Sequence, residues 1–334
     1  MGRRRLTGRI RVTAVVLAIL PVVAISACGG SGAGSATKTP PLSVAYVAPI
    51  GAMEPLWMAD ETHSFAGHQI KVQMRYIQAN AAIAALLAKD VDVLEISAPP
   101  VLTADLHSQG KPPIVFVGSA LNHAILSLYA EPSIKTAEQL KGATLASDRP
   151  GTPNDYAIRA ALSLLGVKAS DVNLLPVGSS DAELGALESG QVKGAILGPP
   201  QSFTAASKGF RDLQDTYSVP YQNVGFAVLR SRLDELGPAL VPFLAALRDG
   251  IKAYNGQPKL AQQVLQKYSK EQNPDILKKT YEFYRDRPFE TSLQPTMAGI
   301  QGNLDFLVAT VPQARGAKAS DFVELRFLRQ LPSQ

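Results

Sequence analysis

The sequence is poor in the residues that most often carry covalent or metal chemistry. Its 334 residues include one cysteine, Cys28, and four histidines, at positions 63, 68, 107 and 123. A single cysteine excludes an internal disulfide framework and a cysteine-based metal site. The histidines lack the spacing of metal ligands, and neither a nucleophile elbow nor a phosphate-binding loop signature occurs. We therefore expect no cofactor, no metal and no catalytic residue.

The chain also lacks a basic surface pattern once its N-terminus is set aside. Residues 1–27 hold five arginines and no acidic residue. Taking those five from the 33 basic residues of the whole chain leaves 28, which equals the 28 acidic residues. No basic stripe with interleaved aromatic residues occurs in the remainder, so we expect no nucleic-acid partner.

The N-terminus has the order of an export signal. The arginines are followed by an almost wholly apolar stretch, residues 12–25, which contains Pro21 and is shorter than the ~20 residues of a stable spanning helix. Ile25-Ser-Ala-Cys28 then resembles the lipobox of bacterial lipoproteins, in which the cysteine thiol takes a diacylglyceryl group. We predict a signal peptide over 1–27, lipidation of Cys28 and an extracytoplasmic location, anchored to the cell membrane. The alternative is a plain secretory signal with a chance cysteine.

Residues 28–41 are typical of a flexible tether. The stretch GGSGAGSATKT is rich in glycine and serine, and two prolines stiffen its end. It is superficially similar to a glycine-rich nucleotide loop, but it precedes the first predicted strand, whereas a dinucleotide fingerprint must follow one. About 290 residues remain, enough for a large core and usually two lobes.

Those residues alternate between strand and helix patterns. Strands are predicted at 42–47, 70–77, 91–96, 114–117, 125–129, 143–146, 172–177, 195–197 and 223–229. Helices are predicted at 81–89, 101–109, 153–165, 203–208, 238–254, 258–268, 274–283 and 295–308, several of them with proline at the first turn. Further helices are predicted in a stretch that ends at Phe65, after a capping box at Thr136 and Gln139, and from a capping box at Ser180 to Gly190. Single helices between strands imply a mainly parallel sheet covered on both faces. The fold class is therefore α/β.

The order of several segments resembles one family. These are LSVAYVAPI from Leu42, AALLAKDVDVL from Ala84, LKGATLA from Leu140 and ALESGQVKGAI from Ala186. Together they are similar to type 2 periplasmic binding proteins of the nitrate/sulfonate/taurine and thiamine-precursor branch, often called SsuA/THI5-like. The resemblance implies two α/β lobes, each a mainly parallel sheet flanked by helices, joined by two crossing strands. It places lobe 1 at 42–123 plus 222–334, and lobe 2 at 124–221.

The same resemblance implies binding without chemistry. A monomer would capture a small molecule between its lobes and deliver it to the permease of an ABC importer. Two alternatives stay open: an enzyme of the thiamine-pyrimidine-synthase type, and a ligand-sensing lipoprotein on the same fold. The enzyme depends on a cysteine-rich motif that this chain lacks. Departures such as Ala79-Asn80, where related proteins often have paired glycines, leave the ligand unnamed.

The sharpest candidate for a ligand contact is the helix start near Arg149. Thr152 is placed as an N-cap, with proline after it and Asp155 completing a capping box. Free N–H groups and the positive helix end favour an anionic group, which Arg149 could clamp. The alternative is an ordinary turn whose donors are satisfied locally by Asp148 and Asp155. The candidates from this loop are Ser147, Arg149, Gly151, Thr152 and Asn154.

Other candidates follow the remaining strands, because ligands in open α/β sheets sit at the carboxyl ends of strands. They are Ile50, Gly51, Met53, Glu54, Gln78, Asn80, Ser97, Asn122, Gly198 and Pro199. Two of these, Asn80 and Ser97, can equally serve as helix caps. The lone tryptophan, Trp57, is interpreted as a packing residue of its helix.

Overall fold

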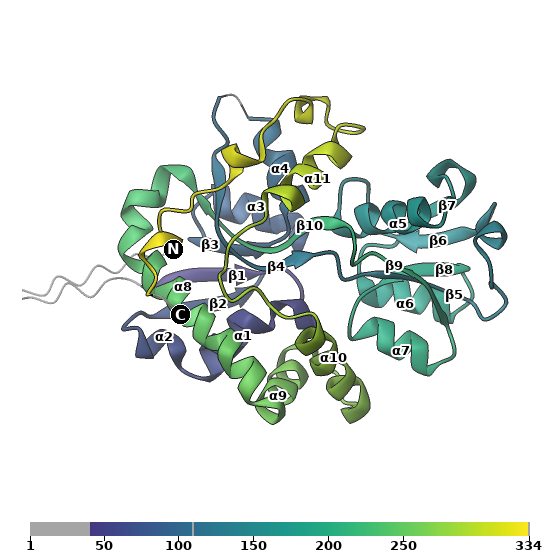
Figure 1. The fold of residues 1–334 in the computed structure, drawn as a ribbon, viewed down its shortest axis with the longest axis horizontal. Helices are drawn as coiled ribbons and strands as arrows, with labels where there is room; N and C mark the ends of the chain where they lie inside the picture. The colour runs from purple at the N-terminus through teal and green to yellow at the C-terminus, as the bar shows by residue number, and fades with distance from the viewer. Residues whose placement is uncertain (1–40, 109, 333–334) are drawn as a thin grey trace, which may run out of the picture. The chain divides into compact units, whose positions relative to one another are not determined.

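A computed structural model describes residues 41–108 and 110–332 (Figure 1). The chain divides into residues 1–39 and 40–334, and the second unit is described by itself. The predicted signal peptide, Cys28 and all but the last residue of the predicted tether lie outside the described residues.

The first sheet contains five strands in the order β2-β1-β3-β10-β4. Its strands are β1 (Leu42–Tyr46), β2 (Val72–Tyr76), β3 (Val93–Ile96), β4 (Ile114–His123) and β10 (Pro220–Leu229). Strand β1 pairs in parallel with β2 and β3, whereas β10 runs antiparallel to β3 and β4. All four residues of β3 are buried, as expected for a central strand covered by helices on both faces.

The second sheet repeats this plan in the order β7-β6-β8-β5-β9. Its strands are β5 (Ser127–Ala130), β6 (Thr144–Ser147), β7 (Asn173–Pro176), β8 (Gly194–Leu197) and β9 (Arg211–Asp215). Strand β5 is antiparallel to β8 and β9, while β6 is parallel to β7 and β8. Below, the first sheet with its helices is called lobe 1 and the second is called lobe 2.

Two short connections, residues 124–126 and 216–219, carry the chain between the sheets. Each leads into the single strand that opposes its sheet, β5 or β10. Strands that are joined by helices all begin at the end of the sheet that is far from the other lobe, and they finish at the end that faces it. A strand that arrives directly from the other lobe begins at the end of the sheet that faces that lobe. It therefore runs antiparallel to its neighbours.

Helices cover both faces of the first sheet (Figure 1). One face packs against α1 (Glu54–Glu61), α2 (Ser64–Gly67), α8 (Leu233–Gly256), α9 (Pro258–Ser269) and α10 (Pro274–Asp286). The other face packs against α3 (Ala79–Leu87), α4 (Ala98–Leu106) and α11 (Met297–Leu307). In lobe 2, α5 (Pro153–Leu164) covers one face, and α6 (Ser180–Glu188) and α7 (Gln201–Ser207) cover the other.

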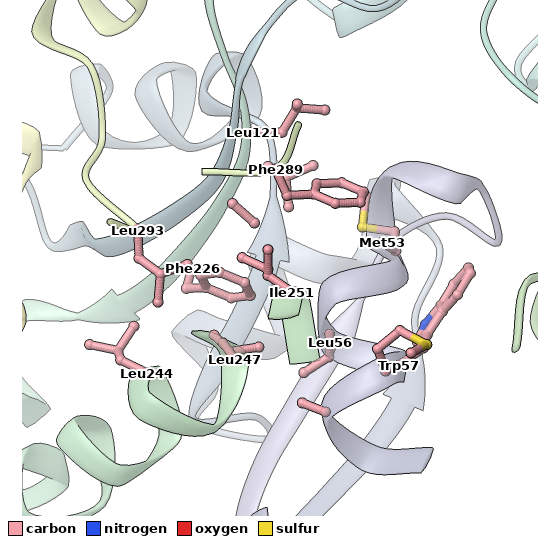
Figure 2. Close-up of a cluster of buried hydrophobic side chains, with 14 of the residues drawn as sticks. Met53, Leu56, Trp57, Leu121, Phe226, Leu244, Leu247, Ile251, Phe289 and Leu293 are labelled. Carbon is pink, nitrogen blue, oxygen red and sulfur yellow. The ribbon is translucent and has the colours of Figure 1, made fainter. Parts of the chain in front are cut away.

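The larger core lies between the first sheet and helices α1 and α8 (Figure 2). Leu56 and Trp57 of α1 are fully buried there with Leu247 and Ile251 of α8. The Trp57 ring stacks on Tyr268 with 4.6 Å between the ring centres. Trp57 is therefore a packing residue, as its sequence context indicated.

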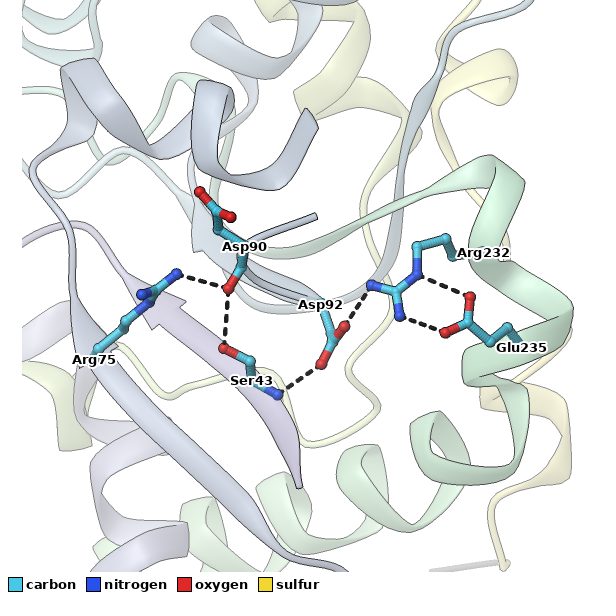
Figure 3. Close-up of polar contacts among 6 residues, drawn as sticks. All are labelled: Ser43, Arg75, Asp90, Asp92, Arg232 and Glu235. Atoms are coloured by element: carbon cyan, nitrogen blue, oxygen red, sulfur yellow. Dashed lines mark hydrogen bonds and ion pairs between the residues drawn. The ribbon is translucent and has the colours of Figure 1, made fainter. Parts of the chain in front are cut away.

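A polar network links the starts of strands β1 and β3 to the start of α8 (Figure 3). Arg232, just before α8, bonds Asp92 and, through its Nε, Glu235 at 2.9 Å. The second oxygen of Asp92 accepts the Ser43 N–H at 2.8 Å, so one carboxylate links the starts of β1, β3 and α8. The network stabilises the end of the sheet that is far from the other lobe.

Several local predictions were wrong. Strand β4, predicted at 114–117, continues to His123, and α4, predicted to begin at 101, begins at Ala98. Strand β9 was missed because Arg-Asp-Leu-Gln-Asp has one apolar residue and lies at a sheet edge. Helix α8 begins at Leu233 rather than Pro238, and both Pro238 and Pro242 lie inside it on its less buried side. Helix α6 is capped by Ser179, whose side chain accepts the Ala182 N–H, and not by Ser180.

Candidate ligand-binding cleft

A cavity of about 460 Å³ lies between the two lobes. Its walls are loops that follow β1, β2 and β3 in lobe 1 and β6, β7 and β8 in lobe 2, so they lie at the carboxyl ends of the parallel strands. The connection 124–126 contributes as well, through Leu126, and so does the start of β10, through Tyr221 and Asn223. A concave site built from two sheets in this way is typical of small-molecule binding.

The cavity brings together part of the predicted site. The predicted residues on its wall are Ile50, Met53, Gln78, Asn80, Ser97, Arg149 and Asn154. They follow four strands, β1, β2, β3 and β6, and are spread over about a hundred residues of sequence. Whether each one contacts ligand stays a prediction.

In lobe 1, three predicted residues lie behind the wall. A side chain on Gly51 would come within 2.6 Å of the Tyr284 ring, so this glycine allows η1 (Gly51–Met53) to pack on α10. Glu54 is fully buried, and burial raises the pKa of its carboxyl well above the usual range. Asn122 donates to the Gln294 carbonyl at 2.8 Å and accepts from Ser119, which holds it at the end of β4.

In lobe 2, five predicted residues also lie behind the wall. Ser147 is fully buried at the end of β6, and Gly151 adopts a positive φ of 84° in the turn before α5. Thr152 is the N-cap of α5. A side chain on Gly198 would come within 2.7 Å of Leu126, and Pro199 is buried beside it. These positions shape the loops, and a ligand contact for any of them stays a prediction.

The helix start at α5 is satisfied largely by its own carboxylates. Thr152 Oγ1 accepts the Asp155 N–H at 3.3 Å, while Asp155 Oδ2 accepts the Gly151 N–H at 2.9 Å. Asp155 Oδ1 also pairs with Arg159 Nε at 2.7 Å, and Asp148 accepts the Arg149 N–H at 2.7 Å. The alternative of local satisfaction therefore holds for these donors. The Arg149 guanidinium is 66% exposed, with its Nε 3.7 Å from Asp148.

A second helix start, at α6, also faces the cavity and was missed. Gly178, Ser179, Ser180 and Asp181 line the wall directly after β7. Their sequence signal was present, because glycine and two serines follow a strand and precede an acidic first turn. Gln201, at the start of α7, lines the wall beside them and donates to Asp181 at 2.9 Å.

A buried carboxylate joins the two helix starts. Glu183 of α6 is fully buried, and both of its oxygens accept from Asn154 Nδ2 of α5 at 2.8 Å. Burial raises the pKa of Glu183 well above its usual range, the Asn154 hydrogen bond opposes that shift, and the charge of Asp148 adds to it. Burial and the charge of Asp148 therefore favour the protonated form of Glu183, whereas the Asn154 hydrogen bond favours its ionised form.

Tyrosines line other parts of the cavity. Tyr76, at the end of β2, is 48% exposed, and its ring centre lies 5.7 Å from that of Tyr46. Tyr156 and Tyr221 are largely buried, with ring centres 4.7 Å apart, and Tyr156 donates to the Pro220 carbonyl. Sequence patterns did not predict these three lining tyrosines, because Tyr76 meets Tyr46, and Tyr156 meets Tyr221, only through contacts between distant segments.

Neither a metal site nor a membrane-spanning helix is found in the part of the chain that the structure describes. Within 41–108 and 110–332, no group of three or more histidine, cysteine, aspartate or glutamate side chains is placed to bind a metal ion. Over the same ranges no helix is long and apolar enough to cross a membrane.

The fold is that of a two-lobed α/β periplasmic binding protein. The alkanesulfonate-binding protein SsuA from Xanthomonas axonopodis pv. citri, bound to MOPS, matches with a TM-score of 0.71 and 17% identity, over 87% of this chain and all of that one. The aliphatic sulphonate-binding protein SsuA from Escherichia coli matches with a TM-score of 0.69 and 18% identity, over 89% of this chain and 94% of that one.

The chain belongs to the NMT1-like family, whose model matches residues 35–263, more than half of its length. No curated protein sequence matches significantly. The fold is also found in an enzyme, the desulfurization enzyme DSZB, with a TM-score of 0.66 and 13% identity, over 86% of this chain and 98% of that one. Likeness at these identities concerns the fold, and the family confirms the resemblance seen in the sequence.

Proposed function

We propose that this protein is an extracytoplasmic solute-binding lipoprotein of an ABC importer. It captures a small molecule between its lobes and delivers that molecule to a transmembrane permease subunit. The single observation that carries the proposal is the cavity of about 460 Å³, which both lobes line with loops at the carboxyl ends of their strands. The fold shared with two sulfonate-binding proteins supports it.

Binding in such a cleft needs no chemistry. Within the described residues, the chain passes between the sheets only at 124–126 and 216–219, so the lobes can rotate about these connections as a hinge. Closure is favoured only to the extent that ligand makes more contacts with the closed form than with the open one. A closed, ligand-loaded monomer then docks on the permease.

Isothermal titration calorimetry and mass spectrometry on the purified chain, starting at Cys28, test the proposal. The expected result is one small molecule bound per chain and recovered with unchanged mass. A screen should contain sulfonates, nitrate, carboxylates, amines and pyrimidine precursors. Turnover of a bound compound would assign the protein to the enzyme class instead, and the absence of binding to any compound class would remove the proposal.

A further inference from the structure

Two amide side chains on the lobe 2 wall give their NH₂ groups to acidic side chains of α6. Asn154 gives its NH₂ group to Glu183, and Gln201 gives its NH₂ group to Asp181. An ionised carboxylate can only accept hydrogen bonds, so the Asp181 carboxylate fixes which end of the Gln201 amide faces it. The amide oxygens of Asn154 and Gln201 have no hydrogen-bond partner among the described residues. Both therefore lack a donor.

Two carboxylates on the same wall also have spare acceptor capacity. Asp148 uses Oδ1 for the Arg149 N–H, and Asp181 uses Oδ1 for Gln201. In each case the second oxygen accepts no hydrogen bond from the described residues. An ionised carboxylate has about four acceptor positions, so one bond leaves it far from satisfied.

The positive groups nearby do not neutralise the negative charge of this wall. Arg149 is the single basic side chain that lines the cavity within the described residues, against Asp148 and Asp181. It is 66% exposed and lies beside Asp148, so water and its neighbour screen its charge. At the helix starts, Asp155 takes the Gly151 N–H and the Ser179 hydroxyl takes the Ala182 N–H. The wall thus has an excess of acceptors and of negative charge.

The lobe 1 wall opposite differs in character. Tyr76 exposes nearly half of its surface at the end of β2, and the apolar side chains of Ile50 and Met53 line the same cavity. An aromatic face attracts a cation within about 6 Å of its centre and also packs against an apolar group. No acidic or basic side chain comes from the described residues of this wall.

We propose that the ligand carries a protonated nitrogen with N–H donors, as in an ammonium, amidinium or guanidinium group. This group lies against Asp148 and Asp181, while the apolar part of the ligand contacts Tyr76. The inference rests on the proposed solute-binding function and narrows its ligand class. It replaces the anionic ligand favoured by the sequence around Arg149, because local carboxylates already occupy much of that helix start.

The test uses probes matched in size and opposite in charge. They are ethanolamine with glycolate, butylamine with butyrate, and tyramine with 3-(4-hydroxyphenyl)propanoate. Calorimetry and thermal unfolding of the full mature chain should show binding by at least one amine and by none of the carboxylates. The amine that binds is then titrated into Asp181→Asn, in which the new amide oxygen still accepts from Gln201. Loss of a charge-assisted bond should weaken binding about ten- to hundredfold.

Asp234→Asn is the matched control, because that carboxylate is 94% exposed and does not line the cavity. It should bind the amine as tightly as the parent. Binding of carboxylates alone, or amine binding unchanged in Asp181→Asn, would overturn the cation inference and leave solute binding intact. If no amine binds, the inference also fails. If the broader solute screen fails too, the proposed function fails with it.

Discussion

Thr152 is the residue on which the first turn of α5 depends. Its hydroxyl accepts the Asp155 N–H at 3.3 Å and donates to the Arg149 carbonyl at 2.8 Å. One side chain therefore caps the helix and closes the turn that presents Arg149 to the cavity. This capping role can be tested separately from ligand contact.

Replacing Thr152 by alanine should lower the free energy of unfolding by about 1 kcal/mol, because the N-cap hydrogen bond is lost. Chemical denaturation with urea measures the change. Thr152→Ser retains the capping oxygen and should stay close to the parent. Equal loss in both variants would show that the methyl group, rather than the cap, carries the effect.

Burial is the cause of the raised pKa of Glu54. Its carboxyl is fully buried at the start of α1, and desolvation raises its pKa well above 4.5. The folded state therefore holds its proton at pH values where the unfolded chain has released it. The stability that this proton contributes is complete below pH 4.5 and is lost as the pH rises toward the folded pKa.

Glu54→Gln should remove this part of the pH dependence. The parent loses about 1.4 kcal/mol per pH unit from this site between the unfolded and folded pKa values, whereas the amide loses none. Urea unfolding from pH 4 to pH 8 should therefore show the variant gaining on the parent as the pH rises. Parallel curves for the two proteins would mean that Glu54 is ionised in the fold.

At the scale of elements, the crossing of α1 and α8 is set by a glycine. A side chain on Gly250 would come within 2.6 Å of the Pro55 carbonyl oxygen and 2.8 Å of the Ala59 nitrogen. Both are backbone atoms, so they cannot move aside without shifting α1. The start of α1 follows directly on η1, whose Met53 lines the cavity.

Gly250→Ala should destabilise the protein by about 1–3 kcal/mol, because the added methyl group forces the two helices apart. Gly185→Ala is the control: Gly185 lies inside α6 with nothing within 4 Å of an added carbon. That change should be neutral or stabilise by up to about 1 kcal/mol, as expected for glycine in a helix interior. Thermal unfolding of the pair distinguishes a steric effect from a helix-propensity effect.

Element prediction succeeded where local signals were strong. The capping box at Thr136 and Gln139 is present, and α9 and α10 begin at Pro258 and Pro274 as predicted. It failed for α8, because the apolar face formed by Leu233, Leu236 and Leu240 packs on the core and outweighs the two missing N–H groups. Tertiary packing decided that helix start.

At the scale of the whole molecule, the predicted anchor at Cys28 lies outside the described residues and remains open to direct test. Cys28→Ser should move most of the protein from the membrane pellet to the soluble fraction, since the only thiol of the chain is removed. Ser31→Ala, in the same predicted tether, should leave the distribution unchanged. Membrane retention of the Cys28 variant would contradict lipidation.

The sequence alone determined the α/β class, the order of nearly all strands and helices, and the family. These follow from apolar periodicity and from proline and capping signals, which act over a few residues and are readable along the chain. The same signals located the loops after β1, β2, β3 and β6, because the carboxyl ends of parallel strands share an edge.

Only the tertiary structure decided what those loops present to a ligand. Arg149 alone suggests an anion, but Asn154 and Glu183, which are 29 residues apart, meet across two helices. Gln201 reaches Asp181 over 20 residues in the same way. Hydrogen bonds between distant residues determine which oxygens remain free, and no local pattern in the sequence carries that information. The character of the cavity wall is therefore a property of the packed lobes.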